Sequence, residues 1–119
     1  ELIVGLRDDP LFGPFAVVGL GGVYVEALRD VAFRLLPIDA GDVGEMLNEL
    51  RSSRLLAAFR GRPARDRDAA ARAIVQLSEI YLAHRVALED LEINPLIVLG
   101  EGEGVRAVDL RAVWKQGTE

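Results

Sequence analysis

The order of the regular segments most tightly constrains what this chain of 119 residues can fold into. Strand-like runs fill its first third, two helical segments follow, and two more strand-like runs close it. Strands, then helices, then strands indicate an α+β layer in which helices cover a largely antiparallel sheet. The expected strands are residues 1–6, 15–19, 23–28, 31–38, 91–99 and 105–113.

Helical spacing is clearest from about residue 66 to residue 85, where either Asp66 or Asp68 can cap the start. A second, shorter helix is expected after Asp39, which is a plausible N-cap. The apolar side of the long helix should comprise Ala70, Ala73, Ile74, Leu77, Ile80 and Tyr81, and that of the shorter helix Val43, Met46, Leu47 and Leu50.

Composition limits the functional class. One domain is expected, and it is large enough to bury a real core. The chain has neither a run of 18 apolar residues nor the basic start of a signal peptide, so we expect a cytoplasmic protein with no membrane partner. The lack of cysteine excludes disulfides and thiolate metal sites, and a formal charge of -5 argues against nucleic-acid binding. The strand-like start without Met suggests a fragment of a longer protein.

The segment Leu-Glu-Ile-Asn-Pro around Asn94 is the strongest candidate site. On a strand, Glu92 and Asn94 project from the same face. If the glycine-rich loop 100–104 turns a hairpin, Asn94 lies opposite Asp109 and Glu92 lies opposite Arg111. Two acids and one amide then converge, and oxygen ligands of this kind suit Mg²⁺. The alternative is a cross-strand pair of Glu92 with Arg111 on a solvated face.

The glycine-rich run from Gly19 to Gly22 is a second candidate, because glycines let backbone amides approach an anion closely. It is not a P-loop, since the Lys-Ser/Thr ending is absent, and it is not a dinucleotide fingerprint, since a strand follows it. A glycine bulge or hairpin connection is the alternative. Glu26 and Arg34 either pair with each other across neighbouring strands or act as ligand groups.

Six short motifs occur in order along nearly the whole chain. They are Glu1-Leu-Ile-Val-Gly5, Asp9-Pro-Leu-Phe-Gly-Pro14, Gly19-Leu-Gly-Gly-Val-Tyr-Val-Glu26, Asp30-Val-Ala-Phe-Arg34, Leu91-Glu-Ile-Asn-Pro-Leu96 and Ala107-Val-Asp109. Together they resemble the NDP-forming acyl-CoA synthetases (acetate–CoA ligase, ADP-forming), which are related to the succinyl-CoA synthetase β subunit. The resemblance implies that residues 1–113 are the C-terminal half of an ATP-grasp domain, with residues 114–119 as a tail.

The resemblance also implies a site for Mg²⁺ and ATP or ADP. It makes Asn94 and Asp109 the metal ligands, with Glu92 as a further ligand or an outer acid. The remaining implied site residues are Gly21, Gly22 and Glu26 as catalytic, and Gly19, Gly21 and Gly22 as nucleotide-binding, with Arg34 as a further candidate ligand group.

Members of that family convert an acyl-CoA, phosphate and ADP into a free acid, CoA and ATP, through acyl phosphate and phosphohistidine intermediates. The implied partners are the first ATP-grasp lobe, a CoA-binding module and a phosphohistidine-bearing ligase module, all outside these residues. The chain alone is therefore expected to fold, to bind Mg-ATP weakly at best and to show no turnover. The only histidine, His84, matches no family phosphohistidine and is expected at the surface or as a cap. The alternative function is a regulatory or structural ATP-grasp-like module in a fused protein acetyltransferase.

Overall fold

The computed structural model describes residues 1–20, 30–51, 56 and 63–116, and the side chain of Leu20 is outside this description. The predicted strand at 23–28 lies outside the described residues. The elements are β1 (Leu2–Asp9), β2 (Gly13–Leu20), β3 (Val31–Leu35), α2 (Ala40–Glu49), α3 (Arg67–His84), β4 (Leu88–Val98), β5 (Val105–Ala107) and β6 (Leu110–Trp114).

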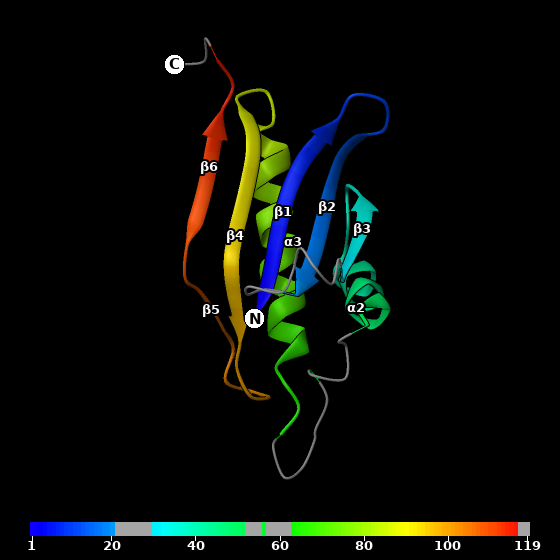
Figure 1. Cartoon of the computed structure of the whole chain (residues 1–119), viewed down its shortest axis with the longest axis vertical. Coiled ribbons are helices and arrows are strands. Elements are labelled where there is room, and N and C mark those ends of the chain that lie inside the picture. The colour runs from blue at the N-terminus through cyan, green and yellow to red at the C-terminus, as the bar shows by residue number, and fades with distance from the viewer. Residues whose placement is uncertain (21–29, 52–55, 57–62, 117–119) are drawn as a thin grey trace.

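The six strands form one sheet in which every described pairing is antiparallel. Its order is β3-β2-β1-β4, and β5 and β6 follow one another along the outer edge of β4 (Figure 1). The predicted α+β fold with an antiparallel sheet is therefore confirmed.

Both described helices pack on the same face of the sheet. In Figure 1, α3 runs behind β1 and β4, and α2 lies beside β3. Alternate strand residues point toward these helices, as a half-covered antiparallel sheet requires. Of the helices that the structure describes, none is long and apolar enough to cross a membrane. The core is built from Leu2, Val4, Leu6, Ala16, Val18, Ala32, Leu91, Ile93, Leu96 and Val98 of the strands, and from Val43, Met46, Leu47, Ile74, Leu77 and Tyr81 of the helices.

Asp39 is confirmed as the N-cap of α2, and of the two candidates for α3 the cap is Asp66 and not Asp68. Asp39 forms a capping box with Asp42, in which each carboxylate accepts a hydrogen bond of 2.9 Å from the other residue's backbone N–H. Asp66 caps α3 by accepting from Ala69 N at 3.1 Å, and it also accepts from Gly104 N at 2.8 Å. These backbone hydrogen bonds hold the pKa of Asp66 below its ordinary value, and the bond from Ala69 lowers it more than the bond from Gly104 does. One buried carboxylate thus ties the start of α3 to the hairpin loop 100–104.

Three details differ from the sequence-based expectation. The strand expected at 105–113 is divided into β5 and β6, with residues 108–109 between them. The strand expected at 31–38 ends at Leu35, shortly before Pro37, which has no N–H to donate to a sheet. Ile80 was expected on the inner face of α3 but is 52% exposed. The buried residues Ile74 and Tyr81 are seven positions apart and so lie on nearly the same side of the helix, whereas Ile80 is turned about 100° away from Tyr81.

A hydrogen-bond network centred on Asp8 fixes the C-terminal end of α3 to β1. The fully buried Tyr81 donates its hydroxyl hydrogen to Asp8 Oδ2 at 2.7 Å, and Arg85 Nη2 donates to Asp8 Oδ1 at 2.7 Å. Burial alone would raise the pKa of Asp8. The hydrogen bonds from Tyr81 and Arg85, together with the positive charge of Arg85, outweigh burial, so the pKa of Asp8 lies below its ordinary value. Burial, and then the bond to Asp8, raise the pKa of Tyr81. Lys115 extends the network by donating to the carbonyl of Arg85 at 2.9 Å.

Asp8→Asn should lower the free energy of unfolding by about 2 kcal/mol at pH 7, because two bonds to a carboxylate lose their charge assistance. Because the pKa of Asp8 is lower in the folded state than in the unfolded state, its ionised form stabilises the fold at pH values above the unfolded-state pKa. This stabilisation is lost as the pH falls through the folded-state pKa. The cost of Asp8→Asn, measured by urea denaturation, should therefore shrink at acidic pH, below about pH 4. Asp68→Asn is the matched control, since Asp68 is exposed. Equal costs for the two variants, or a cost of Asp8→Asn independent of pH, would contradict this account.

Candidate functional site

The face of the sheet that α2 and α3 do not cover carries the predicted metal residues. Strand register aligns its side chains in rows that run across the strands. Apolar residues occupy the β3 and β2 end of each row, and a carboxylate occupies the β4 position. One row is Phe33, Val17, Gly5, Glu92 and Arg111, and the next is Leu35, Phe15, Arg7, Asp90 and Val113. We call this surface the open face.

The hairpin register predicted from the sequence is confirmed. Glu92 pairs with Arg111, and the backbone N–H of Asn94 donates to the carbonyl oxygen of Asp109 at 3.0 Å. Loop 100–104 closes the hairpin, with Glu103 N donating to the carbonyl of Gly100 at 2.8 Å. The register therefore sets Asn94 opposite Asp109, which lies between β5 and β6.

A β-bulge lies at the same point. Leu2 pairs with Leu96 and Val4 pairs with Ile93, so β4 has one more residue than β1 between these pairs. The extra residue falls in the Asn94–Pro95 step, after which the inward positions continue at Leu96. Bulges of this kind bend a strand and change the direction of a side chain, and they are frequent beside functional sites.

The side chains at this point suit a magnesium ion. Asn94 and Asp109 are exposed, and within the described part of the chain their side chains make no hydrogen bond or ion pair. The Glu92 side chain is 21% exposed, and its Oε2 lies 3.9 Å from Arg111 Nη1, too far for a hydrogen bond. The Glu92–Arg111 pair that the sequence also allowed is thus present, but it is loose.

The size of this group limits how it could hold a metal. Among the described residues, no set of three or more His, Cys, Asp or Glu side chains is placed to bind an ion. A metal here would be held by one carboxylate, one amide oxygen and at most a second carboxylate, with water or phosphate oxygens completing its shell. Mg²⁺ is bound in this way at nucleotide sites, because it keeps several waters and takes few protein ligands.

Two glycines shape the open face near these residues. A Cβ on Gly19 would lie 2.7 Å from Val31 Cγ1 and 3.0 Å from the carbonyl of Asp30, so close packing of β3 against β2 explains this glycine. Gly5 pairs with Glu92 and is buried, and a Cβ on it would lie 3.1 Å from Val17 Cγ1, so close packing of β2 against β1 explains this glycine as well. The sequence carries Gly5 only as the end of its first motif, and the one local signal for this packing is a glycine within a predicted strand. Gly21, Gly22 and Glu26 lie outside the described residues, so their predicted roles stay predictions.

Arg34 lies away from this group. It pairs with Ala16, a core residue, and so projects toward the helices. Its Nη2 lies 2.5 Å from Glu49 Oε2 and 3.6 Å from Glu45 Oε2, both on α2. The structure therefore places Arg34 between β3 and α2, away from the candidate metal residues Glu92, Asn94 and Asp109.

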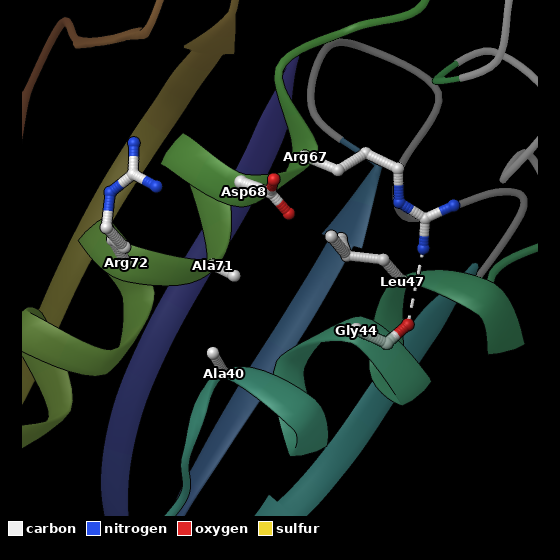
Figure 2. Close-up of a pocket in the computed structure, with 7 residues that line it drawn as sticks. All are labelled: Ala40, Gly44, Leu47, Arg67, Asp68, Ala71 and Arg72. Carbon is white, nitrogen blue, oxygen red and sulfur yellow. Dashed lines mark hydrogen bonds between the residues drawn. The ribbon is translucent and has the colours of Figure 1, made fainter.

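A pocket of about 230 Å³ lies between α2 and α3, on the helix side of the sheet. In Figure 2, Arg67 reaches across to α2 while Arg72 extends the other way. Arg67 Nη2 donates to the carbonyl of Gly44 at 3.3 Å and to Asn48 Oδ1 at 2.7 Å, so its charge is already engaged in joining the helices. Of the predicted site residues that the structure describes, none lines this pocket.

Comparison with known proteins assigns the family. Residues 1–113 match the family model described as an ATP-grasp domain. The chain belongs to the ATP-grasp family. It is 43% identical over 113 residues to acetate–CoA ligase [ADP-forming] I of Archaeoglobus fulgidus, covering 95% of this chain and 16% of that protein. It is 35% identical over 115 residues to the β subunit of acetate–CoA ligase [ADP-forming] II of Pyrococcus furiosus, covering 97% of this chain and 49% of that subunit.

A solved structure shows the same ATP-grasp architecture. It is a dinucleotide-forming acetyl-coenzyme A synthetase 1 of Ca. Korarchaeum cryptofilum, in complex with coenzyme A and Mg-AMPPCP, with its phosphohistidine segment pointing towards the nucleotide binding site. The TM-score is 0.87 at 36% identity, over 97% of this chain and 53% of that one. The present chain thus spans about half the length of the β subunit and of the solved chain, and a far smaller share of the single-chain ligase.

Asp109→Asn and Asn94→Ala should each weaken binding of Mn²⁺, used as a probe for Mg²⁺, by about tenfold or more, because each removes one of few protein ligands. Calorimetry or water-proton relaxation on the 119-residue chain measures this affinity. Glu101→Gln is the matched control, since it removes a charge from the exposed loop of the same hairpin. An affinity in either site variant equal to that of Glu101→Gln would argue against a metal at this position.

Proposed function

We propose that this chain is the C-terminal, metal-holding lobe of the ATP-grasp domain of an ADP-forming acyl-CoA synthetase. One observation carries the proposal. Asn94 and Asp109 lie opposite one another in the hairpin register, exposed and without a side-chain partner among the described residues, in a chain whose relatives are ADP-forming ligases. The proposed overall reaction converts an acyl-CoA, phosphate and ADP into the acid, CoA and ATP.

The residues of the chain supply position and charge. Phosphoryl transfer between a phosphohistidine and ADP needs mainly alignment and neutralisation of negative charge. A bound Mg²⁺ would supply the positive charge that this acidic chain lacks. In the proposal, Asn94 and Asp109 hold that ion, Glu92 supports it, and the Gly19–Gly22 run with Glu26 lines the transfer site.

The rest of the enzyme supplies the other components. The first ATP-grasp lobe would close over the nucleotide, a CoA-binding module would bind the thioester, and a ligase module would carry the phosphohistidine segment. This division is consistent with relatives of which the chain covers 16% or 49%. Acyl specificity therefore belongs to modules outside this chain.

In the full-length synthetase that contains this chain, Asn94→Ala and Asp109→Ala should abolish Mg²⁺-dependent, CoA- and acid-dependent ATP hydrolysis. The reason is that the metal loses one of few protein ligands while the core is unchanged, so circular dichroism and the unfolding midpoint should stay the same. Asp68→Ala, an exposed carboxylate on α3, should keep full activity. Normal turnover in both site variants would refute the proposed function.

The 119-residue chain by itself should show no turnover and should bind Mg-ATP only weakly, because one lobe contacts one side of the nucleotide. Isothermal titration calorimetry with Mg-ATP measures this. A saturable, sub-micromolar affinity would show that the chain holds a complete nucleotide site, contrary to the division of the domain proposed above.

A further inference from the structure

The helix layer stops short of the edge strand β6. In Figure 1, α3 runs behind β1 and β4, whereas no helix that the structure describes lies behind β6. Register pairs Leu110, Ala112 and Trp114 with residues of β4 that are buried against the helices. Because paired residues project from the same face, these three side chains lie on the helix side of the sheet. All three are nevertheless exposed, Leu110 by 62% and Trp114 by 57%.

One flank of α3 continues this apolar surface. Ala71 faces α2, because it lines the pocket between the two helices (Figure 2). Ile80 follows Ala71 after a helical rotation of about 180°, so it projects from the side of α3 that is turned away from α2. Since α2 lies beside β3 and β6 is at the opposite edge of the sheet, Ile80 projects toward the β6 side, where it is 52% exposed. We call Ile80, Leu110, Ala112 and Trp114 the β6 surface.

The dimensions of the β6 surface match one further helix. Neighbouring strands are about 4.8 Å apart, so β6 lies about 7 Å across the sheet from a helix axis placed between β1 and β4. Packed helices lie about 8–10 Å apart. A helix packed against the Ile80 side of α3 would therefore run behind β6 and cover its three apolar side chains.

A second copy of the chain fits this surface less well. Two copies paired along β6 would extend the sheet and would place their α3 helices about 19 Å apart, which is four strand spacings. That separation is about twice the distance between packed helices, so the helix side of both β6 strands would stay uncovered. The geometry therefore favours a separate helix over a symmetric dimer.

We infer that the β6 surface is the docking site for an amphipathic helix supplied by the remainder of the synthetase. The inference rests on the proposed function only in placing the chain within a larger enzyme, and it does not use the metal site. The chain covers 16% of the single-chain relative and 49% of the β subunit, so both relatives have further polypeptide that can supply a helix. Such a helix would present an apolar stripe of residues three and four positions apart.

Lys115 adds a charge to the rim of the β6 surface. It directly follows Trp114, is exposed, and makes no ion pair among the described residues. Its ammonium group donates a hydrogen bond to the carbonyl of Arg85 at 2.9 Å, which holds it at the C-terminal end of α3. We therefore expect the docked helix to carry an acidic side chain at this end.

Photo-cross-linking in the full-length synthetase tests the inference. Leu110 is replaced by benzoylphenylalanine, and the adducts formed on irradiation are mapped by mass spectrometry. The expected adduct joins position 110 to one segment outside these 119 residues whose apolar residues repeat every three or four positions. Ile80→Asp should reduce the yield of this adduct about fivefold or more, because it sets a charge against the apolar stripe of the docked helix. Leu35→Asp is the matched control, since Leu35 is 55% exposed at the opposite edge of the sheet, and it should leave the yield unchanged.

Every other outcome overturns the inference. An adduct with a second copy of the chain would show that β6 is a contact between copies, and an adduct with a segment of alternating apolar residues would show that a strand docks there. Absence of any adduct in the assembled enzyme would show that the surface is free. Equal yields in Ile80→Asp and Leu35→Asp would show that the partner does not contact α3.

The proposed function fails separately from this inference. Asn94→Ala and Asp109→Ala leave the β6 surface unchanged, so both variants should form the adduct in normal yield. Normal turnover in these variants would reject the metal-holding role, while the mapped adduct would still establish the docked helix.

Discussion

The pairing register of β4 between β1 and β6 is the constraint on which the rest of the structure depends. It points Leu91 and Ile93 toward the helices and leaves Glu92 and Asn94 at the open face. Because side chains alternate along a strand, a slip of one residue would bury the polar set and expose the apolar one. Core packing and the candidate metal site are therefore fixed by the same hydrogen bonds. The bulge at Asn94–Pro95 is the one place where this alternation is interrupted.

The helix layer stabilises that register from one side only. Asp66 joins the start of α3 to the hairpin loop that sets the pairing of β4, and Asp8 joins the end of α3 to β1 through Tyr81. Both carboxylates have lowered pKa values because hydrogen bonds favour their charged forms. Within the described part of the chain, Asn94 and Asp109 remain without side-chain partners, while Asp8 and Asp66 are engaged in hydrogen bonds with the helix layer.

Local patterns were sufficient to predict the hairpin around loop 100–104, the cap Asp39 and the alignment of Asn94 with Asp109, and they limited the cap of α3 to Asp66 or Asp68. Each of these depends on residues close in sequence or on simple alternation. The position of Arg34 could not be predicted in this way, since it depends on α2 bringing Glu49 over β3. The Tyr81–Asp8 bond joins residues 73 positions apart, and its partners carry no local signal. Tertiary packing, rather than propensity, decided both.

The central claim is that Asn94 and Asp109 hold the metal of a nucleotide site that only the complete domain can close. Anomalous diffraction from crystals of the full-length synthetase with Mn²⁺ and ADP tests it most directly. The account predicts one manganese ion about 2.1 Å from a side-chain oxygen of each residue, bridged to the phosphates. Manganese bound to ADP but held by other side chains, with Asn94 and Asp109 left in solvent, would contradict it.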